Sequence, residues 1–149
     1  MSYTKESVPQ DTLKSLIEDN WDPQEGNVPC PQVEILASLP PSIRFDLQKR
    51  DYIFIAQDTQ GEEITMRSTC EHYDKVFPLV VLIQSSVSRQ RLYDIKKQLR
   101  LICFNNIHSF TGWQRLLYKT FIEEGDEQPK TYKGRIRLTV DSLGVPIAN

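Results

Sequence analysis

The sequence predicts an α+β fold: a mixed, mostly antiparallel sheet with an N-terminal helix and a central helix packed on one of its faces. The first observation is an apolar, β-branched run over 76–83, whose length suits a buried strand. The second is the closing pair of segments 114–122 and 132–140, which alternates apolar and polar residues. The third is an apolar stripe with the period of an α-helix, formed by Leu92, Ile95, Leu99 and Ile102. Strands and helices in this order favour a sheet with its helices over one face.

The N-terminal segment is predicted to hold a polar arm and one short helix. Residues 1–10 are mostly polar and are expected to form a loose arm. Ser7 and Asp11 are both plausible caps for the helix, and Pro9 is acceptable in a first turn. Its apolar positions are Leu13, Leu16, Ile17 and Trp21.

Extended segments are predicted between this helix and the central strand. Proline and glycine punctuate the region, and short β-branched or aromatic runs alternate with turn residues. The predicted elements are a strand near Val33–Leu36, a possible edge strand over Ile43–Leu47, a strand over Asp51–Gln57, a continuation of the hairpin over Ile64–Arg67, and a connection over Ser68–Asp74.

The central helix, 88–104, is predicted to begin after Ser86 or Ser88, because serine hydroxyls accept hydrogen bonds from the first helical turn. Asn105 and Asn106 supply its stop. The closing hairpin turns over 123–130. Its second strand has a buried face of Tyr132, Gly134, Ile136, Leu138 and Val140 and a wet, basic face of Lys133, Arg135, Arg137 and Thr139.

Size and composition predict one folded domain over residues 1–149. The formal charge of -2 and the pI near 5.7 give no general attraction to nucleic acid or to anionic membrane. The 3 cysteines form no CxxC pair and leave one unpaired in any disulfide scheme, which favours free thiols and a reducing compartment. There is no signal-like start and no apolar run of bilayer length, so we expect a soluble protein without a membrane partner, made in a cytoplasm.

The sequence gives no positive indication of an enzyme, and it predicts no catalytic, cofactor-binding or metal-binding residues. Cys70 and His72 lack the spacing of a common zinc motif. A nucleophilic pair using Cys70 or Cys103 with His72 or His108 is formally open, but Cys103 lies near the apolar stripe, where a cysteine is normally inert. The acidic residues of Glu62-Glu63 and of 123–127 fall in predicted turns, where charged side chains usually contact only solvent. No phosphate-binding glycine loop, GxSxG or HExxH occurs.

Basic side chains on the central helix and on the closing strand are the candidate subunit or partner interface. The ordinary interpretation is a solvated helix face, and the alternatives are contact with an acidic neighbouring subunit or with phosphates. The solvated face is favoured over phosphate binding because the aromatic residues lie in apolar strands. The candidates are Arg89, Arg91, Lys96, Lys97, Arg100, Arg135 and Arg137.

Four stretches carry a resemblance to a known family, and together they span about Leu13 to Val140. They are the opening helix ending in Leu16-Ile17-Glu18-Asp19-Asn20-Trp21 with Pro23 after it, the strand Asp51-Tyr52-Ile53-Phe54-Ile55, the passage Ser85-Ser86-Val87-Ser88-Arg89-Gln90-Arg91-Leu92, and the closing hairpin. In this order they resemble the tail terminator, or tail-completion, proteins of the neck of tailed viruses, particularly versions from archaeal viruses.

The resemblance implies a homo-oligomeric ring, commonly of six subunits, that caps the tail tube and joins it to the neck in the virion. Its implied partners are the tail tube protein and a neck or connector protein, and DNA would pass through the lumen without specific binding. It implies no catalytic residue and no cofactor, and it makes the sheets of adjacent subunits an inner wall. The proline-rich segment 28–42 and the connection 68–74 depart from the family, which leaves a head-tail connector or a minor tail protein as alternatives.

The sequence also permits pairing of sheet edges between subunits. The strands Ile43–Leu47 and Tyr132–Val140 have no blocking proline in their interiors. Two further hypotheses come from other classes: a small nucleic-acid-binding module using the basic face of helix 88–104, and an enzyme using Cys70 and His72.

Overall fold

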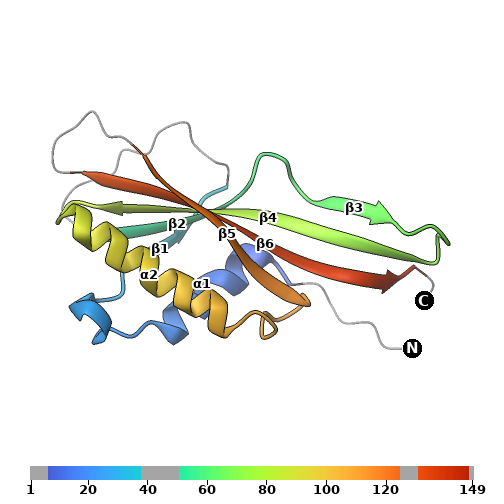
Figure 1. Cartoon of the computed structure of the whole chain (residues 1–149), viewed down its shortest axis with the longest axis horizontal. Helices are drawn as coiled ribbons and strands as arrows, with labels where there is room; N and C mark the ends of the chain where they lie inside the picture. Colours follow the sequence, from blue (N-terminus) through green and yellow to red (C-terminus); the bar gives the residue numbers. More distant parts are fainter. Residues whose placement is uncertain (1–6, 38–50, 125–130, 148–149) are drawn as a thin grey trace.

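The computed structural model describes residues 7–37, 51–124 and 131–147 and has the predicted α+β architecture (Figure 1). The sheet has 6 strands in the order β1-β2-β4-β6-β5, and β3 pairs with β4 beside this path. Only β1 and β2 pair in parallel, so the described sheet is mixed and mostly antiparallel. The elements are α1 (Pro9–Asn20), a 3-10 turn (Glu25–Asn27), β1 (Gln32–Ile35), β2 (Asp51–Gln57), β3 (Glu63–Met66), β4 (His72–Ser85), α2 (Arg89–Asn105), β5 (Arg115–Glu124) and β6 (Tyr132–Pro146).

Both helices cover the same face of the sheet, as predicted (Figure 1). Leu13 and Ile17 of α1 pack in the same buried cluster as the predicted stripe of α2. The sheet contributes alternate residues to this cluster, including Ile53, Val81 and Ile136. A smaller cluster on the opposite face contains Tyr52, Phe54, Val80 and Leu82, with Leu36 packed against it.

The two helices begin in different ways. Ser88 is the N-cap of α2, and its hydroxyl accepts a hydrogen bond from the Arg91 N–H at 3.0 Å. This confirms Ser88 among the two predicted caps. The predicted caps of α1 are wrong, because Val8 is its N-cap and makes no side-chain bond. Proline in the first turn lacks an N–H, so one fewer backbone donor needs a partner there, and Ser7 instead donates to the Thr111 carbonyl oxygen at 2.6 Å.

Two strands are longer than the sequence predicted, and this changes the shape of the sheet. β4 begins at His72, so the predicted connection over 68–74 is wrong in its last residues, and β6 continues past Val140 to Pro146. Polar residues interrupt the apolar pattern in these parts, so the sequence pattern did not predict that they belong to strands. Together with β3 they form a strand extension, which we define as residues 63–66, 72–76 and 142–146. It projects beyond both helices (Figure 1).

The edges of the sheet also differ from the predicted ones. Tyr132–Val140 is not an edge, because β6 pairs with β4 on one side and with β5 on the other. Within the described part of the chain, β1 and β5 are the outer strands of this order, and β3 is a further outer strand because it pairs with β4 alone. The predicted edge strand Ile43–Leu47 lies outside the described residues. Of the glutamates predicted in turns, Glu63 begins β3, while Glu123 and Glu124 end β5.

No helix among the described residues is long and apolar enough to cross a membrane.

Candidate assembly interface

The first residue of the predicted basic interface, Arg89, binds a carboxylate of its own chain. Its guanidinium contacts both oxygens of Glu123 on β5, at 2.7 and 2.9 Å. The Tyr93 hydroxyl donates to the same carboxylate at 2.6 Å. The hydrogen bonds from Arg89 and Tyr93 hold the pKa of Glu123 below its usual value, and the bond to Glu123 raises the pKa of Tyr93. Glu123 is therefore an ion-pair partner that fastens α2 to β5.

Arg91 binds a carboxylate on the other side of α2, where the helix meets β2. Its Nη1 lies 2.9 Å from Oδ2 of Asp51, and the Ser85 hydroxyl donates to Oδ1 of the same carboxylate at 2.7 Å. Only 7% of the Asp51 side chain is exposed. A buried carboxylate needs such partners, since burying an unpaired charge is costly. Asp51 thus joins the start of β2, the end of β4 and the first turn of α2.

The remaining predicted residues divide between paired and unpaired ones. Lys96 lies over the rings of Tyr93 and Phe121, with its Nζ 4.5 and 4.9 Å from their centroids. Among the described residues, Arg100 has no ion-pair partner. The other contacts are Lys97 with Glu25 at 3.7 Å, Arg135 with Glu124 at 2.8 Å and Arg137 with Asp58 at 4.0 Å. Most of the predicted basic interface therefore contacts its own chain, and its role as an interface stays a prediction.

Replacing Asp51 by alanine is expected to destabilise the protein by about 1–3 kcal/mol, because Arg91 and Ser85 both lose their partner at a buried position. Chemical denaturation at neutral pH measures the change. Glu25→Ala is the matched control, since Glu25 contacts Lys97 at 3.7 Å and both side chains are about half exposed. Equal losses for the two variants would contradict the anchoring role of Asp51.

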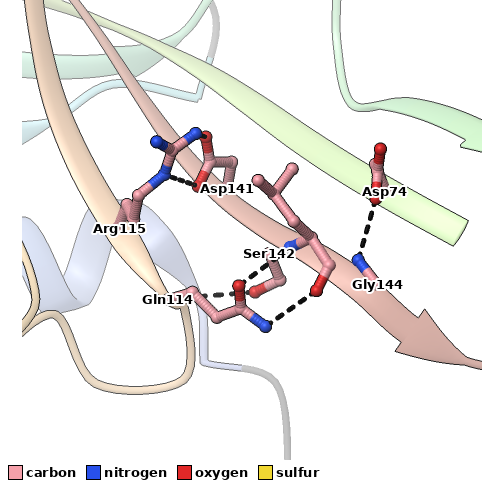
Figure 2. A network of polar contacts seen from close by, with 7 residues as sticks. Asp74, Gln114, Arg115, Asp141, Ser142 and Gly144 are labelled. Carbon is pink, nitrogen blue, oxygen red and sulfur yellow. Dashed lines mark hydrogen bonds and ion pairs between the residues drawn. The ribbon is translucent and has the colours of Figure 1, made fainter.

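A polar network joins β4 to β6 within the strand extension and joins β5 to β6 next to it (Figure 2). Asp74 of β4 accepts a hydrogen bond from the Gly144 N–H of β6 at 2.8 Å and contacts Arg67 at 3.0 Å. These interactions, led by the Gly144 bond, lower the pKa of Asp74. Arg115 binds both oxygens of Asp141 at 2.9 and 2.7 Å, which fixes the start of β5 to β6.

Gln114 completes the hydrogen bonding of β6 where β5 has not yet begun. Its side-chain amide donates to the Leu143 carbonyl oxygen and accepts from the Leu143 N–H, both at 3.0 Å (Figure 2). Its backbone N–H donates to the Asp141 carbonyl oxygen at 2.9 Å. One side chain thus takes the place of a strand residue, and it occupies a backbone edge that another chain would otherwise pair with.

Replacing Gln114 by alanine is expected to speed amide exchange at Leu143 by about fivefold, the effect of losing a hydrogen bond worth about 1 kcal/mol. Hydrogen exchange followed by NMR measures it. Gln114→Glu is the matched control, because a carboxylate still accepts from the Leu143 N–H but cannot donate to its carbonyl oxygen. Unchanged exchange in the alanine variant would show that Gln114 does not protect this edge.

Exposed apolar side chains lie on the strand extension. Ile64 and Met66 of β3 are 57% and 51% exposed. They pair with Lys75 and Tyr73 of β4, which places them on the face of the sheet that the helices cover elsewhere. Glu62 and Glu63 precede them, and within the described ranges neither has an ion-pair partner. The alternation of Ile64 and Met66 with polar residues is visible in the sequence, but it predicts only a hairpin and not an exposed apolar surface.

A second exposed apolar patch lies near the end of α2. Phe104 is 52% exposed and Leu101 38%. The Phe104 ring meets the Tyr118 ring of β5 edge to face, with centroids 6.0 Å apart. Arg100 lies one helical turn before Phe104, and its charge acts on the Tyr118 hydroxyl, whose pKa burial raises. Lys119 follows Tyr118 in a β-bulge of β5 and, in the described part of the chain, has no ion-pair partner either.

The cysteine and histidine residues weighed as a nucleophilic site are not brought together with a third partner among the described residues. Cys70 is exposed in the turn before β4, and His72 begins that strand. Cys103 is buried, and burial raises the pKa of its thiol to about 12, which disfavours the nucleophilic thiolate. Within the same residues, no group of three or more His, Cys, Asp or Glu side chains is arranged to hold a metal ion.

Comparison with known proteins gives a structural match only. No protein-family model and no curated protein matches the sequence. A solved structure of the virion of a native gene transfer agent particle contains a chain that is similar to this one, with a TM-score of 0.62. The match covers 91% of this chain and 94% of that chain at 10% sequence identity. At this identity, the similarity shows that the two chains share a fold.

Proposed function

We propose that this protein is a structural component of a virion, and specifically a tail terminator that forms a ring of six subunits between tail tube and neck. The observation that carries the proposal is the fold shared with a virion chain over nearly the full length of both proteins. The order of elements also matches the resemblance drawn from the sequence. Its place is the tail or neck of a virion, and its partners are further copies of itself, the tail tube protein and a neck protein.

The surface of the protein supports a role in assembly over a role in catalysis. In the described structure, a nucleophile with an adjacent base is not assembled around Cys70 or Cys103, and the carboxylates that contact α2 and β5 are engaged in ion pairs. Both exposed apolar patches and the outer strands β1 and β5 offer contacts to other chains. A head-tail connector or a minor tail protein of the same neck is the alternative role.

Nucleic-acid binding by α2 is a weaker candidate for a physical reason. Arg89, Arg91 and Lys97 each contact a carboxylate of the same chain, which reduces the charge they offer to phosphates. A binder would lose DNA affinity as salt rises and on charge reversal at Lys96 and Lys97. A ring protein of this kind is expected to respond weakly to both.

The test is the mass of the purified protein by light scattering across a concentration series, followed by negative-stain imaging of any large species. We expect closed rings of about six subunits. A monomer at every concentration, together with salt-dependent DNA binding that Lys96→Glu and Lys97→Glu abolish, would favour the nucleic-acid-binding module instead.

A further inference from the structure

We infer that the strand extension of one subunit docks, through Ile64 and Met66, onto the patch formed by Leu101, Phe104 and Tyr118 of the next subunit. The inference rests on one part of the proposed function, the association of several copies of this chain, and it names the surfaces through which they associate. It concerns a contact between two different surfaces of identical chains.

The donor surface lies on a part of the sheet that projects from its own subunit. Ile64 and Met66 lie on a short strand that pairs with β4, on the part of the sheet that projects past the helices (Figure 1). Their side chains are more than half exposed, although they face the side on which the rest of the sheet is covered by α1 and α2. Apolar side chains next to each other on such a face are typical of a contact site.

The acceptor surface is also apolar and lies on a rigid support. Leu101 and Phe104 belong to the last turns of α2, and the opposite side of that helix is anchored in the core by Ile102 and Cys103. The edge-to-face contact with Tyr118 fixes the Phe104 ring to β5. Aromatic side chains that are ordered before binding give up little conformational entropy when a partner covers them.

Charge complementarity identifies the occupant as a second copy of this chain. Glu62 and Glu63 precede the donor side chains; Glu63 lies on the opposite face of β3, and Lys75 pairs with Ile64. Residues 62–75 still carry more acidic side chains (Glu62, Glu63, Glu71 and Asp74) than basic ones (Arg67 and Lys75), while Arg100 and Lys119 lie next to the acceptor rings. Among the described residues, Glu62, Glu63, Arg100 and Lys119 have no ion-pair partner, in contrast to Arg89, Arg91 and Lys97 of α2. Like-charged patches would repel each other, so two donors or two acceptors do not match, whereas a donor and an acceptor do.

A contact between two different surfaces has a geometric consequence. Each subunit uses its donor on one neighbour and its acceptor on another, so the contact repeats from subunit to subunit. The chain of subunits closes into a ring if the rotation at each step permits it, and otherwise it grows as a filament. The contact is therefore compatible with a ring but does not require one.

The test uses variants that disable one surface each. The donor variant combines Ile64→Asp and Met66→Asp, and the acceptor variant combines Leu101→Asp and Phe104→Asp. Sedimentation velocity at up to several hundred micromolar measures association, and circular dichroism confirms that each variant folds. We expect both variants to be monomers. Ile122→Asp is the control, because Ile122 is equally exposed but pairs with Arg135 on the other face of the sheet, and it should assemble like the unaltered chain.

Mixing the two variants gives the decisive result. The variant with a disabled donor keeps an intact acceptor, and the variant with a disabled acceptor keeps an intact donor. We therefore expect a complex of one copy of each and nothing larger. A second pair of variants tests the charges: Glu62→Lys with Glu63→Lys should weaken assembly, and adding Arg100→Glu with Lys119→Glu in the same chain should restore it. Assembly of both disabled variants at the unaltered size would overturn the inference, and so would the absence of a mixed pair.

A crosslink keeps the test decisive if the unaltered protein associates weakly. Ile64→Cys and Phe104→Cys are combined in a chain whose exposed cysteines, Cys30 and Cys70, are changed to serine. Oxidation at high concentration should link residue 64 of one chain to residue 104 of another, and the absence of this link would overturn the inference. Linked filaments without rings would support the contact but contradict the proposed ring. Rings that still form in all these variants would support the proposed ring but contradict the contact.

Discussion

Replacing Leu99 by aspartate is expected to prevent folding. Leu99 is 3% exposed and lies in the main core beside Ile95 and Ile102. An aspartate there places an unpaired charge among apolar side chains or forces α2 off the sheet, and either costs several kcal/mol, a large fraction of the stability of a domain of this size. Thermal unfolding followed by circular dichroism measures the loss.

The matched control lies two residues further along the same helix. Leu101→Asp introduces the same charge at a side chain that is 38% exposed, so it should leave the thermal midpoint within a few degrees of the original value. The same variant belongs to the acceptor surface and is expected to weaken association. A folded Leu99→Asp protein, or an unfolded Leu101→Asp protein, would mean that the observed buried side of α2 is wrong.

Replacing Gly134 by valine is expected to cost about 3 kcal/mol through overpacking. Gly134 is a buried position of β6, and a Cβ atom there would meet Phe121 Cε2 at 2.5 Å and Cζ at 2.9 Å. The Phe121 ring lies over the glycine and also contacts Tyr93, whose hydroxyl binds Glu123. A displaced ring would therefore disturb the contact between α2 and β5 as well as the strand itself. Urea denaturation measures the change in the free energy of unfolding.

Two variants separate overpacking from a general effect of valine in this strand. Thr139→Val adds the same side chain to the other face of β6 and should change stability by less than about 0.5 kcal/mol. Phe121→Leu should cost less in the Gly134→Val background than in the unaltered protein, because the smaller side chain makes room. Strictly additive losses would show that Gly134 and Phe121 do not compete for space.

Local patterns in the sequence determined the main elements and their buried sides. The β-branched run of the central strand, the stripe ending in Ile102 and the alternation over Tyr132–Val140 each depend on residues close together in the chain. The Ser88 cap is local in the same way, since one hydroxyl serves an N–H three residues later. These features were enough to predict an α+β sheet with both helices on one face, which the structure confirms.

The tertiary structure alone decided which strands are outermost and which charges are free. Tyr132–Val140 has no blocking proline and is expected from the sequence to offer an edge, but β4 pairs with it on the side away from β5 and makes it internal. Arg89 and Arg91 look like a binding face in the sequence, because their partners Glu123 and Asp51 are more than 30 residues away along the chain. His72–Lys75 is too polar to indicate a strand, yet pairing with β3 and β6 extends β4 through it. Long-range pairing supplies the hydrogen bonds and counter-charges that local patterns do not contain, and it leaves exposed the apolar surfaces through which we expect this chain to assemble.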